Sequence, residues 1–287
     1  MKKNIYLFII LSLSGILIIQ CNKDEQTENN ENNGNNQKLE DLQKGIESLN
    51  KKIEQSNNES ENNNEEYLIR VQPDVGDYYY GSFNIVMSGP MSVNMEMDFW
   101  QDFISVDRGQ IECKMGFKSA KIRMEMGGNE VNYDSDNPYA NEASTAMHAE
   151  MAPLFSADGG MIMDDKGKVL KEYGWEELGD DNFSNQMGLT NVEYPEEAMK
   201  IGDSFNYSTN EEEGMTMNAT YTLDDVSLSE YVFTISGEVF GNASGKVIGG
   251  MIIYRESGMP KSAYLDMDLS GGGESMNMTV SIEASKR

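Results

Sequence analysis

Methionine is the residue type whose number and spacing in this sequence could support binding chemistry. The chain has 21 methionines, and all but Met1 lie beyond residue 86. On a β-strand, residues i and i+2 face the same side, so a Met-x-Met pair presents two thioethers to one face. Five such pairs occur: Met95/Met97, Met124/Met126, Met161/Met163, Met215/Met217 and Met276/Met278.

These pairs have three physical interpretations. Core filling by a flexible side chain is the expected role of any single pair, but the whole set favours a deformable apolar pocket for a hydrophobic or lipid-like ligand. The alternative is a structural or adhesive surface module with a solid core. Copper(I) binding is the third hypothesis, because soft thioether ligands select that ion. The predicted pocket residues are Met95, Met97, Met124, Met126, Met215, Met217, Met276 and Met278.

The other reactive side chains do not form a catalytic pattern. His148 is the only histidine, and neither a Gly-x-Ser-x-Gly elbow nor a Cys/His pair is present. Residues 134–139 begin like a calcium loop, but Pro138 and Tyr139 stand where a ligand and the turn glycine belong, so an Asx-type turn is expected. Paired carboxylates could support glycosidase chemistry, but the chain has 49 acidic residues, so the presence of such pairs does not indicate an active site. We therefore predict no enzymatic activity, no cofactor and no metal.

Aromatic residues and one cysteine provide two further candidates. Tyr78-Tyr79-Tyr80, Trp100 and Trp175 could form a platform for a sugar ring, although tyrosines that alternate along a strand more often divide between core and rim. Cys113 shares a predicted strand face with Ile111, Met115 and Phe117, which indicates a small buried hydrophobe.

The elements that would position these side chains are mostly strands. Period-two alternation predicts half-buried antiparallel strands separated by glycine-rich turns. One interruption, residues 141–155, predicts a helix with Ala143, Met147, Met151 and Leu154 on its buried stripe. The fold class is mainly β (α+β). The predicted strands lie at residues 78–87, 93–99, 121–126, 215–223, 231–239, 247–254, 265–269 and 276–283.

Composition divides the chain before this domain. Residues 22–66 are rich in Asn and Glu and contain no aromatic residue, which predicts a disordered tether. Within it, residues 38–55 predict a short amphipathic helix. Its apolar residues are spaced 3, 4, 3 and 4 apart, like a coiled-coil seam, and weak self-association is the alternative to an isolated frayed helix. They are Leu39, Leu42, Ile46, Leu49 and Ile53.

The net charge of −27 excludes nucleic acid as an expected partner, because phosphate contacts need a basic surface. It also argues against peripheral binding to anionic lipid. The usual role of such a charge is solubility and mutual repulsion.

The N-terminus resembles a lipoprotein signal peptide. Lys2 and Lys3 precede an apolar run from Ile5 to Ile19, and Cys21 follows Gln20, which stands where Gly, Ala or Ser is usual in a lipobox. The resemblance implies removal of residues 1–20 and lipidation of Cys21. An uncleaved membrane helix is the alternative.

The residues after Cys21 resemble the surface-export signal of Bacteroidota lipoproteins, which is a lysine followed by two acids: Lys23, Asp24 and Glu25. This implies an outer-membrane, lipid-anchored protein at the cell surface. Each buried methylene of an attached acyl chain adds about 0.8 kcal/mol to the anchor.

Residues 67–287 form the predicted antiparallel β domain. The order of its signals resembles an uncharacterised family of Bacteroidota lipoprotein domains of unknown function with Met-bearing strands, and this family supplies no activity. At the level of architecture, the domain is similar to the curved half-barrels of lipoprotein carriers. The resemblance implies a curved sheet or half-barrel. The signals are residues 133–138, 163–169, 194–195, 200–205 and 220–223.

Overall fold

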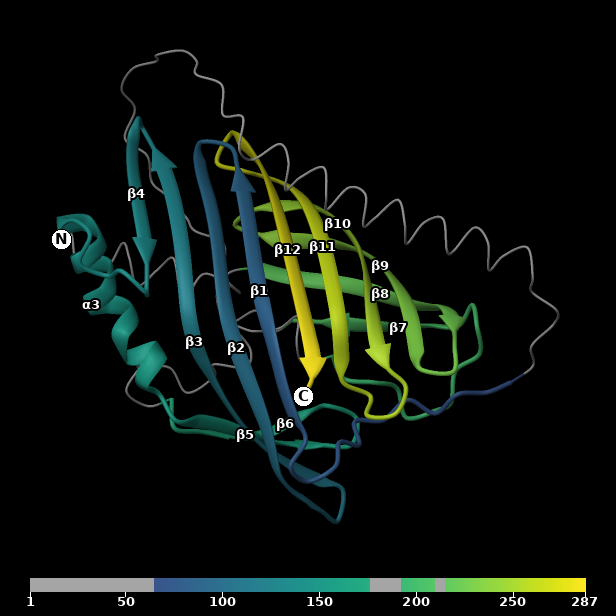
Figure 1. Ribbon diagram of the computed structural model, residues 1–287. Helices are drawn as coiled ribbons and strands as arrows, with labels where there is room; N and C mark the ends of the chain where they lie inside the picture. Colours follow the sequence, from purple (N-terminus) through teal and green to yellow (C-terminus); the bar gives the residue numbers. More distant parts are fainter. Residues whose placement is uncertain (1–64, 176–191, 210–214) are drawn as a thin grey trace. The chain divides into compact units, whose positions relative to one another are not determined.

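The structure is a computed structural model, and it describes residues 65–175, 192–209 and 215–287. Twelve strands form one antiparallel sheet, and helix α3 packs against β3 and β4 (Figure 1). The elements are β1 (Tyr78–Ser88), β2 (Met91–Asp107), β3 (Gln110–Met126), β4 (Asn129–Asp134), α3 (Glu142–Ser156), β5 (Gly159–Asp164), β6 (Val169–Tyr173), β7 (Ser204–Ser208), β8 (Met215–Val226), β9 (Glu230–Gly241), β10 (Ser244–Tyr254), β11 (Pro260–Gly271) and β12 (Glu274–Lys286).

The sheet runs in the order β6-β5-β3-β2-β1-β12-β11-β10-β9-β8-β7, and β4 pairs with the remaining length of β3. The last strand therefore lies beside the first, with Phe83 opposite Ile282. Strands β6 and β7 end this path without pairing with each other, so the sheet is open. The predicted mainly β fold, a curved antiparallel sheet with one principal helix near residues 141–155, is confirmed.

Side-chain alternation divides the sheet into an apolar inner face and a polar outer face. From Met91 to Phe103, strand β2 alternates strictly between buried and half-buried residues. The outer positions of β8 are hydrophilic, including Thr216, Asn218 and Thr220. This is the pattern expected when only one face of an antiparallel sheet is packed.

Glycine permits close approach between strands where the sheet curves through β10. At Gly245, an added Cβ would collide with the backbone oxygen of Asp268 on β11. At Gly249, it would collide with the backbone oxygen of Tyr264. Glycines within strands mark such bends, because a side chain there would force neighbouring backbones apart.

Helix α3 begins where the sequence predicts but buries a slightly different stripe. Its N-cap, Asn141, accepts a 2.8 Å hydrogen bond from the backbone N–H of Ser144. The buried stripe contains Ser144, Met147, Met151 and Leu154, whereas Ala143 is exposed. The prediction of Ala143 was wrong by one position, because the spacing 3, 4, 3 that returns to one helix face starts at residue 144.

Several predictions concern residues 1–64 and lie outside the described part of the chain. They are the signal peptide 1–20, lipidated Cys21, the export signal and the helix 38–55 with its apolar seam. Within the described residues, no helix is both long and apolar enough to cross a membrane.

Candidate functional site: the methionine end of the inner face

The predicted pocket methionines of β2 and β3 lie on the inner face. Met95 is opposite Ile122 and Met97 is opposite Ala120 in the register of the two strands. Both methionines, and Met124 next to this pair, are almost completely buried. These three thioethers are therefore part of the packed core.

The other predicted positions occupy the same face at its margins. Met217, Met276 and Met278 are only partly buried against the core. Met126, the last residue of β3, is 46% exposed although it faces the same side as Met124. Strand β8 begins at Met215, whose side chain is not among those that the structure describes.

Partly or largely exposed thioethers lie along one end of the inner face, near the β1–β2, β3–β4, β9–β10 and β11–β12 hairpins. We call this set the methionine end: Met87, Met126, Met217, Met276 and Met278. Met278 lies opposite Met87 on β1 and opposite Met267 on β11, so three thioethers form one cross-strand row. Met87 was not predicted as a pocket residue because it belongs to no Met-x-Met pair, and the strand order places it here.

The inner face around the methionine end is uncharged at the described positions. In the rows that contain Met87 and Met276, the register partners on β9, β10 and β11 are apolar residues or glycine. Gly237 and Gly245 carry no side chain on these rows and are partly exposed. The surface can therefore contact apolar groups but offers no ion pair to a charged headgroup.

The opposite end of the inner face is closed by aromatic residues. The Tyr79 and Phe103 rings meet edge to face, with 5.8 Å between their centroids. The Tyr79 hydroxyl donates a 2.9 Å hydrogen bond to the Ser257 hydroxyl, and the Tyr194 hydroxyl donates one of 2.9 Å to the Gly258 carbonyl. Burial raises the pKa of both tyrosines, so these hydroxyls remain protonated hydrogen-bond donors. We call this region, formed by Tyr79, Phe103 and Tyr194, the aromatic end, and its side chains are buried and tightly packed.

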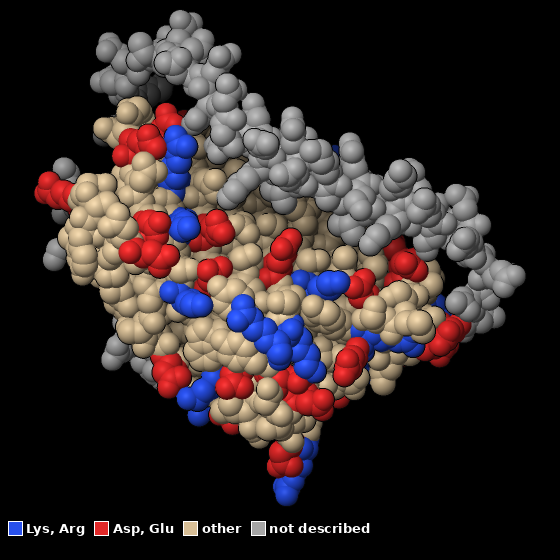
Figure 2. Space-filling model, viewed as in Figure 1, with Lys and Arg blue, Asp and Glu red and all other residues tan. Residues whose placement is uncertain are grey.

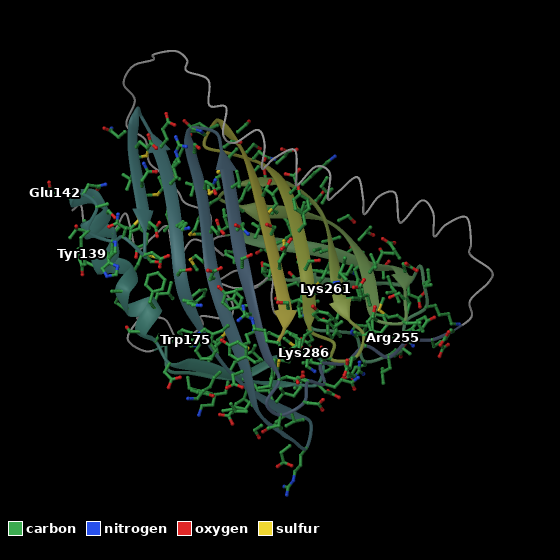
Figure 3. The ribbon with its side chains drawn as sticks, viewed as in Figure 1. Tyr139, Glu142, Trp175, Arg255, Lys261 and Lys286 are labelled. Atoms are coloured by element: carbon green, nitrogen blue, oxygen red, sulfur yellow. The ribbon has the colours of Figure 1, made fainter. Side chains whose placement is uncertain are left out.

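Charged residues surround this aromatic end. The Lys286 ammonium lies 2.8 Å from the Asp77 carboxylate, and the Lys261 ammonium lies 2.6 Å from the Glu230 carboxylate. Lys and Arg side chains gather over the lower half of the face shown in Figure 2, where Lys261, Lys286 and Arg255 are labelled in Figure 3. Ion pairs therefore flank the aromatic end, whereas the inner-face rows that contain Met87 and Met276 carry no charged residue on β9, β10 and β11.

The other sequence candidates do not assemble into a reactive site. Cys113 is completely buried on the inner face, as predicted, and burial raises the pKa of its thiol to about 12. His148 Nδ1 lies 3.0 Å from the Tyr133 hydroxyl. The Asp134 carboxylate accepts the Asp136 N–H at 2.9 Å, which is the predicted Asx-type turn. Among the described residues, no group of three or more His, Cys, Asp or Glu side chains could hold a metal.

Comparisons with known proteins found one family model and no curated relative. A model of a family of unknown function, DUF6263, matches residues 175–273. No curated protein matches the sequence. The predicted resemblance to a domain of unknown function is confirmed at that level, over a shorter stretch than the expected residues 67–287. The Bacteroidota and lipoprotein assignments remain predictions.

Solved structures align with the chain only loosely. A protein described as exported, with a YmcC-like fold, from Bacteroides fragilis has 9% identity and a TM-score of 0.29, covering 76% of this chain and all of its own. A porin-like protein from Bacteroides uniformis has 6% identity and a TM-score of 0.20, covering 77% of this chain and all of its own. A mutant of the Rh. blastica porin has 9% identity and a TM-score of 0.20, covering 73% of this chain and 99% of its own. Scores of this size do not establish a common fold.

Proposed function

We propose that the methionine end binds a hydrophobic, lipid-like ligand. The observation that carries the proposal is the group of partly exposed thioethers on an otherwise uncharged inner face whose other end is plugged. Ligand sites are usually lined by apolar side chains, and methionine adapts its shape to varied partners. The ligand's apolar part would lie on β1, β11 and β12, with its polar part toward the hairpins.

We place this activity at the bacterial outer membrane. The support is the lipobox-like sequence before Cys21 and the Lys23-Asp24-Glu25 signal after it. A tethered binding domain of this kind would hold or transfer its ligand next to the membrane and would perform no chemistry on it.

The test is a thermal melt of the purified chain with and without palmitate. Ligand that binds only the folded state raises the melting temperature. We expect this shift for the wild type and for a variant with Met87, Met217, Met276 and Met278 changed to Leu. Met and Leu have similar volumes, and such a swap usually costs less than about 1.5 kcal/mol per site.

Two charge variants sharpen this test. Met276→Glu should abolish the palmitate shift, because it places a carboxylate at the hairpin end of the apolar surface, where the palmitate carboxylate would lie. Ile248→Glu should keep the shift, because Ile248 is 60% exposed on the outer face. Absence of a shift in the wild type would overturn the proposal and leave the solid-core surface module.

The second candidate function is copper(I) binding. It is favoured by the row of Met87, Met278 and Met267 on three adjacent strands, because soft thioethers select copper(I). A melt shift with copper(I) that disappears in the quadruple Leu variant, without a palmitate shift in either protein, would support this candidate instead.

A further inference from the structure

Two aromatic rings form a parallel pair on the outer face. Tyr78 on β1 and Trp100 on β2 have ring centroids 6.3 Å apart and planes inclined by only 6°. Both side chains are partly exposed, whereas Tyr79 between Tyr78 and Tyr80 is buried. The predicted division of these tyrosines between core and rim is thus observed. Trp175 is 2% exposed and takes no part in this surface.

A glycine on the neighbouring strand sets the position of the indole. Gly116 on β3 lies opposite Trp100 in the register. A Cβ at Gly116 would lie 2.9 Å from the indole Cζ2 and Nε1 atoms, which is closer than van der Waals contact allows. The ring therefore lies against the β3 backbone, in a position that any larger residue at 116 would disturb.

Charged groups lie beside Tyr80, the next outer-face aromatic residue after Tyr78 on β1. The Tyr80 ring, next along β1, contacts the Arg287 guanidinium at 4.6 Å and the Lys118 ammonium at 5.3 Å. The Asp98 carboxylate accepts a 2.6 Å hydrogen bond from the Ser119 hydroxyl. Two cations and one carboxylate therefore lie around the Tyr80 ring.

We propose that this surface, which we call the Tyr78–Trp100 platform, binds a saccharide. The C–H face of a pyranose ring is apolar and suits the negative face of an aromatic ring. Ionised Asp, Lys and Arg groups at the border form strong hydrogen bonds with sugar hydroxyls. The core of a protein interface is instead depleted of charged residues. The site is independent of the methionine end, which lies on the other face of the sheet.

The experiment is titration of the full chain with oligosaccharides while tryptophan fluorescence is recorded. The chain has only two tryptophans, and Trp175 is buried, so a sugar on the platform should change the emission of Trp100. One arm uses neutral oligosaccharides, and the other uses uronic-acid oligosaccharides. Stronger binding in the second arm would assign Lys118 and Arg287 a role in recognising the acid.

Three variants locate the binding, which is then measured by calorimetry. Trp100→Ala should abolish it. Gly116→Ala retains the indole but displaces it, and should weaken binding at least tenfold. Tyr139→Ala is the matched control, because Tyr139 is a 72% exposed aromatic residue outside the platform, and it should bind like the wild type.

If Trp100→Ala does not fold, Gly116→Ala still tests whether the saccharide binds at the Tyr78–Trp100 platform. Failure of the wild type to bind either class of oligosaccharide would overturn the proposal. Binding that is equal in the wild type and Gly116→Ala would also overturn it. A protein from the host envelope whose capture requires Trp100, without saccharide binding, would replace the proposal with a protein-docking surface.

Discussion

At the scale of single residues, the two methionines of one Met-x-Met pair differ in how deeply they are buried. Met124 and Met126 belong to one Met-x-Met pair and face the same side of β3, yet Met124 is 6% exposed and Met126 is 46% exposed. The difference arises because β3 ends at Met126, beside the turn at Gly127. Depth depends on neighbouring strands, which a single stretch of sequence does not specify.

This difference in depth gives a stability prediction. Met95→Ala removes a fully packed side chain and should lower the free energy of unfolding by about 2–5 kcal/mol. Met278→Ala should cost less, because a partly exposed side chain has fewer packed neighbours to lose. Urea denaturation of both variants provides the comparison. Equal losses would mean that Met278 is packed as tightly as Met95, which favours a solid core.

At the scale of elements, strong local signals identified the helix and the long strands. Glycine-rich turns at residues 88–90, 127–129, 241–242 and 271–273 all separate strands as expected. The short strands β4, β5, β6 and β7 were missed. In β5, Gly159 and Gly160 are strand residues, and a Cβ at either position would collide with the Trp175 or the Tyr173 ring. These short strands are defined by pairing with strands distant in the sequence, as β5 pairs with β3, and local sequence does not reveal such pairing.

The cap of α3 gives a prediction at this scale. Asn141→Ala removes the acceptor for the Ser144 N–H and should destabilise the protein by about 1 kcal/mol. Amide hydrogen exchange should become faster in the first turn of α3 and remain unchanged in β12. Asn141→Asp is the control, since its carboxylate can accept the same bond. Unchanged exchange in the first turn of Asn141→Ala would show that the cap contributes nothing.

At the scale of the whole molecule, the order of the strands in the sheet could not be predicted from the sequence. The pairing of β1 with β12 joins the two ends of the domain and brings Met87 beside Met278. The candidate site therefore depends on a contact between segments almost the whole domain apart. The presence of thioethers on one apolar face could be predicted, because that property follows from alternation alone.

Anchoring is the prediction that concerns the whole chain. Cys21→Ala should abolish incorporation of radiolabelled palmitate, because it removes the only proposed lipidation site. The matched control, Cys113→Ala, should incorporate label normally, since Cys113 is buried in the folded domain. Label in the Cys21→Ala protein equal to that of the wild type would contradict the lipobox assignment.

Photo-crosslinking tests the central claim, ligand binding at the methionine end, most directly. The purified chain is irradiated with a diazirine-bearing palmitate, with or without excess unlabelled palmitate, and the modified residues are mapped by mass spectrometry. Binding at the methionine end predicts competed labels around Met87, Met276 and Met278. Competed labels confined to the outer face, around Ile248 and Phe240, or no competed label in the β domain, would contradict it.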